Sequence, residues 1–110
     1  MELFFCFCEK IGLAYYCKDK VQAVLGTHTH VQTADEKILQ NGTGYITDIG
    51  MTGPKNGVIG MDKDAALKRF VTSLPERYKI ATGETMFNSV LFEIDDNTNK
   101  VKNITRINKN

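Results

Sequence analysis

Two histidines, His28 and His30, are the residues of this sequence best suited to chemistry, because only Thr29 separates them and they follow a short apolar run at residues 21–25. If a strand continues through both positions, its two-residue side-chain period points the two imidazole rings to the same side. Neutral imidazole is the commonest metal ligand in proteins, and strand ends that open into loops are where α/β proteins build their sites. The pair therefore predicts a metal centre; the alternative is that both rings only end the strand and hydrogen-bond to backbone carbonyls.

Asp48 is a further candidate for the same site, because it ends an expected strand at residues 45–47. Its carboxylate could support the metal site through a hydrogen bond to a histidine, or it could cap the glycine-rich loop at residues 50–57. That loop suits a close approach to phosphate. It equally suits a tight crossover between elements, since the glycine pattern of a nucleotide-binding loop is missing. No catalytic residue is assigned from the sequence.

An αβ unit is expected to position the histidines. Apolar residues cover most of the surface of a helix at residues 9–17, so this helix is expected to be largely buried, and the strand at residues 21–26 is of the kind that is buried on both faces. The later pattern predicts a helix capped by Asp62 and ended by Pro75, a strand at residues 78–81, and an antiparallel hairpin that pairs residues 90–94 with 101–107.

Composition and charge narrow the function classes. The 110 residues suffice for one small domain, and a net charge of +1 with dispersed basic residues argues against polyanion binding by charge alone, so nothing indicates a nucleic-acid partner. The apolar start is too short to span a bilayer and lacks the features of a signal peptide. The three cysteines, Cys6, Cys8 and Cys17, do not suggest a disulfide framework. We therefore expect a cytoplasmic protein with no membrane partner.

Longer motifs around these residues carry a resemblance to a known family. The run GTHTHVQTAD at residues 26–35 and the block GTGYITDIGMTGP at residues 42–54 resemble two signatures of the YmdB-like cyclic-nucleotide phosphodiesterases, a family of bacterial metallophosphoesterases. Shorter matches follow in the same order, at residues 58–61, 69–70 and 94–96. The resemblance extends from residue 9 to residue 107.

The resemblance implies an α/β fold of the calcineurin-like type, in which two sheets pack face to face with helices outside and a dinuclear metal site lies at the strand ends. This chain is then the C-terminal portion of that two-sheet sandwich, and it ends in an antiparallel hairpin. His28 and His30 match the family's last two histidine ligands, one for each metal. The family's metals are iron or manganese, and its characteristic substrates are 2′,3′-cyclic nucleotides, which are small-molecule phosphodiesters.

Family members are considerably longer than this chain, and their remaining ligands and their catalytic histidine belong to earlier segments. Residues 1–8 contain no histidine where the family has one, so we interpret them as an aberrant N-terminal segment and residues 9–110 as the C-terminal part of a metallophosphoesterase domain. The expected function is that of a partial metal-dependent phosphodiesterase, with two divalent metal ions in the full-length family and incomplete occupancy in this chain. The alternatives are an inactive truncated remnant and a non-enzymatic oligomerisation module that forms a homo-oligomer.

Overall fold

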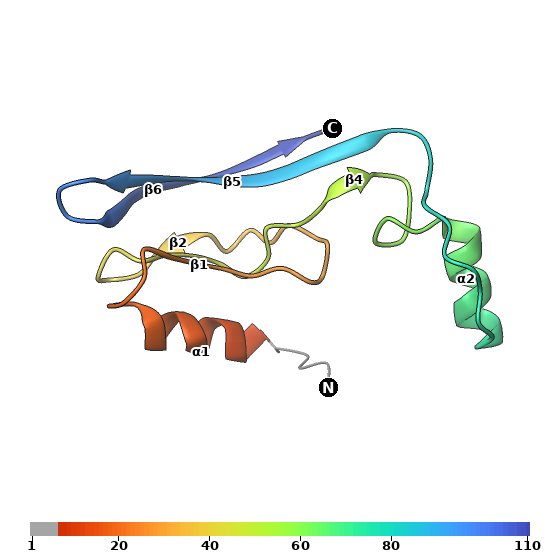
Figure 1. The fold of residues 1–110 in the computed structure, drawn as a ribbon, viewed down its shortest axis with the longest axis horizontal. Coiled ribbons are helices and arrows are strands. Elements are labelled where there is room, and N and C mark those ends of the chain that lie inside the picture. The colour runs from red at the N-terminus through yellow and green to blue at the C-terminus, as the bar shows by residue number, and fades with distance from the viewer. Residues whose placement is uncertain (1–6) are drawn as a thin grey trace.

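The computed structural model describes residues 7–110, which form two three-stranded sheets and two helices (Figure 1). In chain order the elements are α1 Phe7–Cys17, β1 Ala23–Leu25, β2 Lys37–Ile38, β3 Gly44–Ile46, β4 Thr52–Pro54, α2 Lys63–Thr72, β5 Thr85–Asp95 and β6 Lys100–Lys109. This arrangement confirms the α/β class expected from the sequence. Residues 1–6, which make up most of the segment expected to be aberrant, lie outside the described range, and Phe7 and Cys8 belong to α1.

The first sheet positions the histidine loop. Its strand order is β1-β3-β2, with β1 parallel and β2 antiparallel to the central strand β3. The helix α1 packs on this sheet through Ala14, which is buried together with Leu39 and Tyr45, and two half-buried residues pack against this cluster, Ile11 and Val24. The expected αβ unit is therefore present, and it delivers the histidines beyond the carboxyl end of β1.

Both α1 and β1 are more exposed than their sequences predict. The buried residue of α1 is Ala14, whereas Tyr16 is 74% exposed, and Leu25 in β1 is 48% exposed. The expectations of a largely buried helix and of a strand buried on both faces are therefore wrong. The physical reason is that the sheet covers one side of α1, and that within residues 7–110 β1 has a strand partner along one edge only.

The second sheet is antiparallel, in the order β4-β5-β6, and is dominated by the hairpin of β5 and β6. This hairpin confirms the pairing expected between residues 90–94 and 101–107. It lies on the opposite side of the first sheet from α1 (Figure 1). The two sheets approach closely at Gly44 of β3, where a Cβ atom would lie 2.6 Å from the ring of Phe92. The missing side chain at Gly44 therefore lets the hairpin pack on the first sheet.

Two local expectations are wrong. The glycine-rich loop at residues 50–57 is not wholly irregular, because it contains β4, which pairs with β5. The strand expected at residues 78–81 is replaced by an isolated bridge between Met61 and Ile80. Within this segment Ile80 is 65% exposed, whereas Ala81 is buried.

The helix α2 begins after Asp62, whose carboxylate accepts a hydrogen bond of 3.1 Å from the backbone N–H of Ala65. This contact confirms the N-cap expected from the sequence. Ser73 ends the helix in the left-handed conformation, with φ of 55°. The helix lies at one end of the molecule (Figure 1), and its Phe70 side chain is 69% exposed. Neither helix of the described chain has the length and apolar character needed to cross a membrane.

The described chain is elongated, with a radius of gyration of 17.1 Å and extents of 53 × 32 × 17 Å. A compact domain of this length has a radius of gyration of about 13 Å. The excess reflects the long hairpin and the outlying α2 (Figure 1), and β1 is an edge strand of the first sheet.

We predict that the chain self-associates through the open edge of β1, because an apolar edge strand is a template for pairing with another chain. Leu25→Lys places a charge on this strand and should lower the molecular mass measured by light scattering. Val71→Lys, at an 83% exposed position of α2, is the matched control and should leave the mass unchanged. A monodisperse monomer that unfolds in one sharp urea transition would contradict the prediction.

Candidate metal centre

The loop that carries the histidines begins at Gly26, directly after β1. A Cβ atom at this position would lie 1.7 Å from the carbonyl oxygen of Thr47, so glycine is required where the loop passes the end of β3. The backbone then turns, with φ of 107° at His28 and 64° at His30. Such conformations cost about 1–3 kcal/mol at residues other than glycine and persist only where neighbours hold them. The strand does not continue through both histidines, so the condition under which its period would set the directions of their rings is not met.

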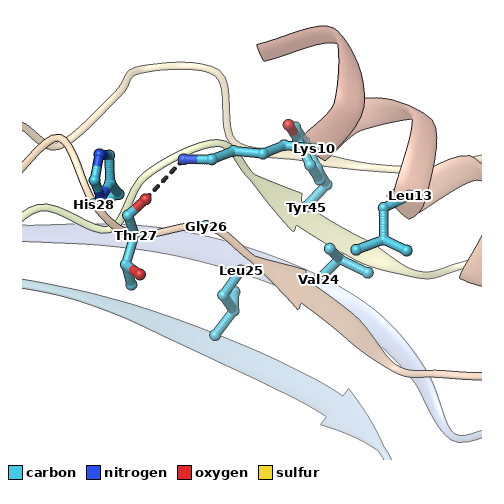
Figure 2. Close-up of a pocket in the computed structure, with 8 residues that line it drawn as sticks. All are labelled: Lys10, Leu13, Val24, Leu25, Gly26, Thr27, His28 and Tyr45. Carbon is cyan, nitrogen blue, oxygen red and sulfur yellow. Dashed lines mark hydrogen bonds between the residues drawn. The ribbon is translucent and has the colours of Figure 1, made fainter. Parts of the chain in front are cut away.

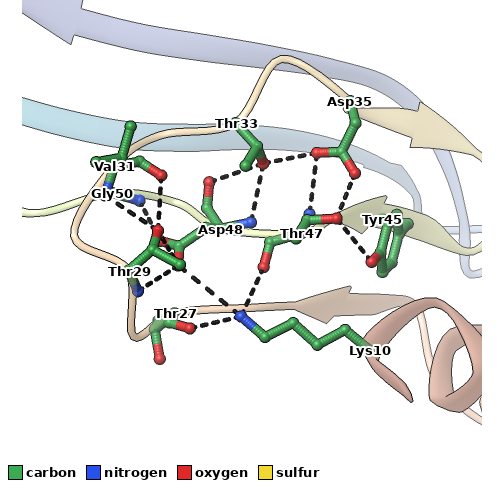
Figure 3. A network of polar contacts seen from close by, with 10 residues as sticks. All are labelled: Lys10, Thr27, Thr29, Val31, Thr33, Asp35, Tyr45, Thr47, Asp48 and Gly50. Carbon is green, nitrogen blue, oxygen red and sulfur yellow. Dashed lines mark hydrogen bonds and ion pairs between the residues drawn. The ribbon is translucent and has the colours of Figure 1, made fainter. Parts of the chain in front are cut away.

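Asp48 is fully buried and binds the histidine loop (Figure 3). Its Oδ2 atom accepts hydrogen bonds from the backbone N–H and the hydroxyl of Thr29, both at 2.8 Å. Its Oδ1 atom accepts a hydrogen bond of 2.9 Å from the N–H of Gly50. The carboxylate thus caps the loop that follows it, which is the second of the two roles considered for Asp48 from the sequence. It also fixes Thr29, the residue between the two histidines.

Lys10 of α1 reaches into the same network (Figure 3). Its ammonium group donates hydrogen bonds to the carbonyl oxygens of Thr27, at 2.7 Å, and Thr47, at 3.3 Å, and lies 3.9 Å from Oδ2 of Asp48. Sequence reasoning missed Lys10, because its partners belong to segments far along the chain and a helical lysine carries no local signal of such a contact.

A second carboxylate, Asp35, ties the far end of the loop to β3. It accepts a hydrogen bond of 2.6 Å from the hydroxyl of Thr33 and further hydrogen bonds from the backbone N–H and the hydroxyl of Thr47. Burial raises the pKa of Asp35, but these hydrogen bonds together outweigh burial and lower the pKa below its ordinary value of 3.8. The ionised form of Asp35 is therefore the one that the fold stabilises.

His30 contacts the backbone of a tight turn. Its Nδ1 atom lies 3.1 Å from the carbonyl oxygen of Ile59. Because a carbonyl only accepts hydrogen bonds, Nδ1 carries the proton in this contact, and neutral His30 keeps an unprotonated Nε2. The turn is closed by hydrogen bonds between Val58 and Met61. Its two central residues, Ile59 and Gly60, have φ of 48° and 90°, and this conformation strains a β-branched residue.

A hollow of about 300 Å³ lies beside β1 (Figure 2). Besides His28, the hollow is lined by residues of α1, β1 and β3 and by the start of the histidine loop, namely Lys10, Leu13, Val24, Leu25, Gly26, Thr27 and Tyr45. His30 is not among these lining residues. The prediction that both rings face one concave site therefore stays a prediction.

The donor set of the described chain is small. Within residues 7–110, no group of three or more His, Cys, Asp or Glu side chains is placed to hold a metal ion. Asp35 and Asp48, which contact the histidine loop, are engaged by hydrogen bonds from that loop and from the β3 segment. The described residues therefore offer two imidazoles, and a complete dinuclear site requires further ligands.

Solved structures share this arrangement. A novel phosphatase from Mycoplasma pneumoniae matches with a TM-score of 0.90 at 34% identity, over 96% of this chain and 38% of that one. A hypothetical protein from Thermus thermophilus matches with a TM-score of 0.89 at 35% identity, over 96% of this chain and 41% of that one. The two sheets and their helices therefore share the calcineurin-like fold of that phosphatase.

Sequence comparison identifies the family. The family model described as YmdB-like protein matches residues 7–107, and the chain belongs to that family. The 2′,3′-cyclic-nucleotide 2′-phosphodiesterase of Bacillus subtilis (strain 168) is 52% identical to this chain over 99 residues. That match covers 90% of this chain and 38% of the Bacillus enzyme, so the chain spans less than half the length of this relative.

The lowered pKa of Asp35 predicts a loss of stability in acid. A carboxyl group with a depressed folded-state pKa contributes stability above its unfolded value and loses this contribution as the pH falls through the folded value. Asp35→Asn should lower the free energy of unfolding at pH 7 by about 2 kcal/mol, the scale of one or two hydrogen bonds to a charged group. Urea unfolding should show this difference shrinking below pH 4. A difference that is constant from pH 7 to pH 2 would refute the role of Asp35.

The Ile59 contact predicts the tautomer of His30. In its neutral form, His30 should carry its proton on Nδ1, which nitrogen-15 NMR of the imidazole ring reports directly. Ile59→Asn retains the backbone carbonyl and suits the left-handed turn better, so the same tautomer is expected in that variant. A neutral His30 that is protonated at Nε2 would show that the carbonyl does not orient the ring.

Proposed function

We propose that this chain supplies the two-histidine part of a dinuclear metal centre in a phosphodiesterase that acts on 2′,3′-cyclic nucleotides. The observation that carries the proposal is the loop beyond β1, which contains both His28 and His30. In this loop Nδ1 of His30 donates to the carbonyl oxygen of Ile59, so Nε2 of the neutral ring is free of a proton. The substrate class is supported by the identity to the Bacillus enzyme, whose name specifies 2′,3′-cyclic nucleotides.

The donor chemistry fits a transition metal. Imidazole nitrogen suits iron, whereas manganese prefers oxygen ligands, so these two residues favour iron and the family resemblance adds manganese as the alternative. In the proposed site His28 and His30 each hold one of two divalent ions. When bound, two such metal ions supply hydroxide at neutral pH and neutralise the charge that develops on a phosphoryl group.

The residues of this chain contribute by holding those ligands in place. His30 presents Nε2 because its other ring nitrogen donates to Ile59. Asp48 binds the backbone N–H of Thr29 between the two ligands, and Lys10 binds the carbonyl before His28. The remaining ligands of the proposed centre belong to the part of the longer relatives that this chain does not span. We therefore propose that the chain alone is inactive or nearly so.

The cysteine content indicates the cellular compartment that we propose for this protein. Three cysteines without a disulfide framework favour a reducing compartment, so we place the function in the cytoplasm. A second candidate function is a homo-oligomerisation module, which is favoured by the exposed Leu25 on the edge strand β1.

Metal binding and hydrolysis test the proposal together. Calorimetry with Co²⁺ and Mn²⁺ should detect weak binding that disappears in the His28→Ala/His30→Ala variant, which contains no histidine. Hydrolysis of a 2′,3′-cyclic nucleotide by the wild-type chain with added metal should not exceed that of the variant. Absence of histidine-dependent metal binding would refute the proposed site. Robust turnover that is lost in the variant would refute the predicted inactivity.

A further inference from the structure

The two residues on either side of His28 are held by one ion pair (Figure 3). The Lys10 ammonium donates to the carbonyl oxygen of Thr27 at 2.7 Å. The Asp48 carboxylate accepts from the N–H and the hydroxyl of Thr29 at 2.8 Å. The ammonium and Oδ2 of Asp48 are 3.9 Å apart. The backbone of His28 is therefore fixed before and after the residue by groups that also attract each other.

The Lys10–Asp48 ion pair and its hydrogen bonds to Thr27 and Thr29, here called the clamp on His28, are strengthened by burial. The Asp48 side chain is 0% exposed and that of Lys10 is 16% exposed. A carboxylate without solvent is costly unless its oxygens are paired, and two of the hydrogen bonds to Asp48 come from Thr29 alone. Movement of the loop would therefore remove the two hydrogen bonds that Oδ2 of the buried Asp48 carboxylate accepts from Thr29. The ion pair thus resists motion of the loop more strongly than an exposed pair would.

His28 needs such support because its backbone is strained. Its φ of 107° is unfavourable for any side chain with a Cβ atom, and strained residues persist where their surroundings over-determine them. The contacts of Lys10 and Asp48 act on the two peptide units that flank His28, which are the units whose orientation defines its conformation. They thereby set the direction in which the imidazole leaves the backbone.

We propose that Lys10 and Asp48 are positioning residues that hold His28 in its metal-binding conformation, an inference that rests on the proposed function. Asp48 acts through Thr29, and Lys10 acts through the carbonyl of Thr27. Neither side chain is a metal ligand or a catalytic residue in this arrangement.

The test uses a side chain that can be altered without removing a buried charge. Thr29→Val deletes the hydroxyl bond to Asp48, whereas Thr29→Ser retains it. Supporting groups behind metal-binding histidines typically change metal affinity by 10- to 100-fold, so Thr29→Val should weaken Co²⁺ binding by about tenfold and Thr29→Ser by less than about twofold. Lys10→Met should weaken binding in the same direction as Thr29→Val.

Asp35→Asn is the matched control, since Asp35 also joins the loop to the β3 segment but does not contact Thr29. This variant should lose stability to urea and keep its Co²⁺ affinity. Equal loss of affinity in Asp35→Asn and Thr29→Val would show a general structural effect and overturn the positioning role. Wild-type affinity in Thr29→Val would overturn it as well.

A metal-free readout separates this inference from the proposed function. The carbon-13 shifts of His28 report its backbone conformation, and they should change in Thr29→Val but not in Thr29→Ser or Asp35→Asn. If these shifts change as expected while the wild-type chain binds no Co²⁺ through its histidines, the proposed function fails and the clamp on His28 stands. If the shifts do not change in Thr29→Val, the clamp fails whatever the metal affinity.

Discussion

The carboxylate of Asp48 lies at a point where three parts of the chain meet without solvent, and its need for hydrogen-bond donors organises the site. The histidine loop supplies Thr29, the following loop supplies Gly50, and α1 supplies Lys10. Each donor also fixes the segment that carries it, because an unsatisfied buried charge costs more than the order imposed on the chain. The satisfaction of one charge thus connects the helix, the first sheet and both loops.

Close packing of the backbone gives this network its geometry. Gly26 lets the histidine loop pass against Thr47, and Gly44 lets the hairpin lie on β3, so the segments approach more closely than any side chain would permit. At such separations main-chain groups and short polar side chains can reach one another, and the Thr33 hydroxyl bridges the Asp35 carboxylate and the backbone N–H of Asp48. Gly26 and Gly44 therefore set how closely these segments approach one another, whereas Gly50 donates directly to Asp48.

Local patterns predicted much of this fold, and nonlocal partners explain the rest. The cap at Asp62, the strand at β3 and the terminal hairpin depend on neighbouring residues, and all three are present. The backbone is not extended at His28, because Asp48 binds the next residue, Thr29, within a turn. The side-chain period of a strand contains no information about such a distant carboxylate. Lys10 was missed for the same reason. The expected burial of α1 and β1 assumed coverage on both sides, which residues 7–110 do not provide.

The two histidines differ in what a point mutation can do to them. In the proposed arrangement, the peptide units that flank His28 are held by the side chains of Lys10 and Asp48, so loss of one of these side-chain contacts weakens the hold on His28. His30 is oriented by the main-chain oxygen of Ile59, an atom that every amino acid carries. Side-chain replacement there alters the strain of the turn but leaves the acceptor in place. The contacts that hold His28 are consequently sensitive to substitution of side chains, whereas the contact between His30 and the backbone of Ile59 is not.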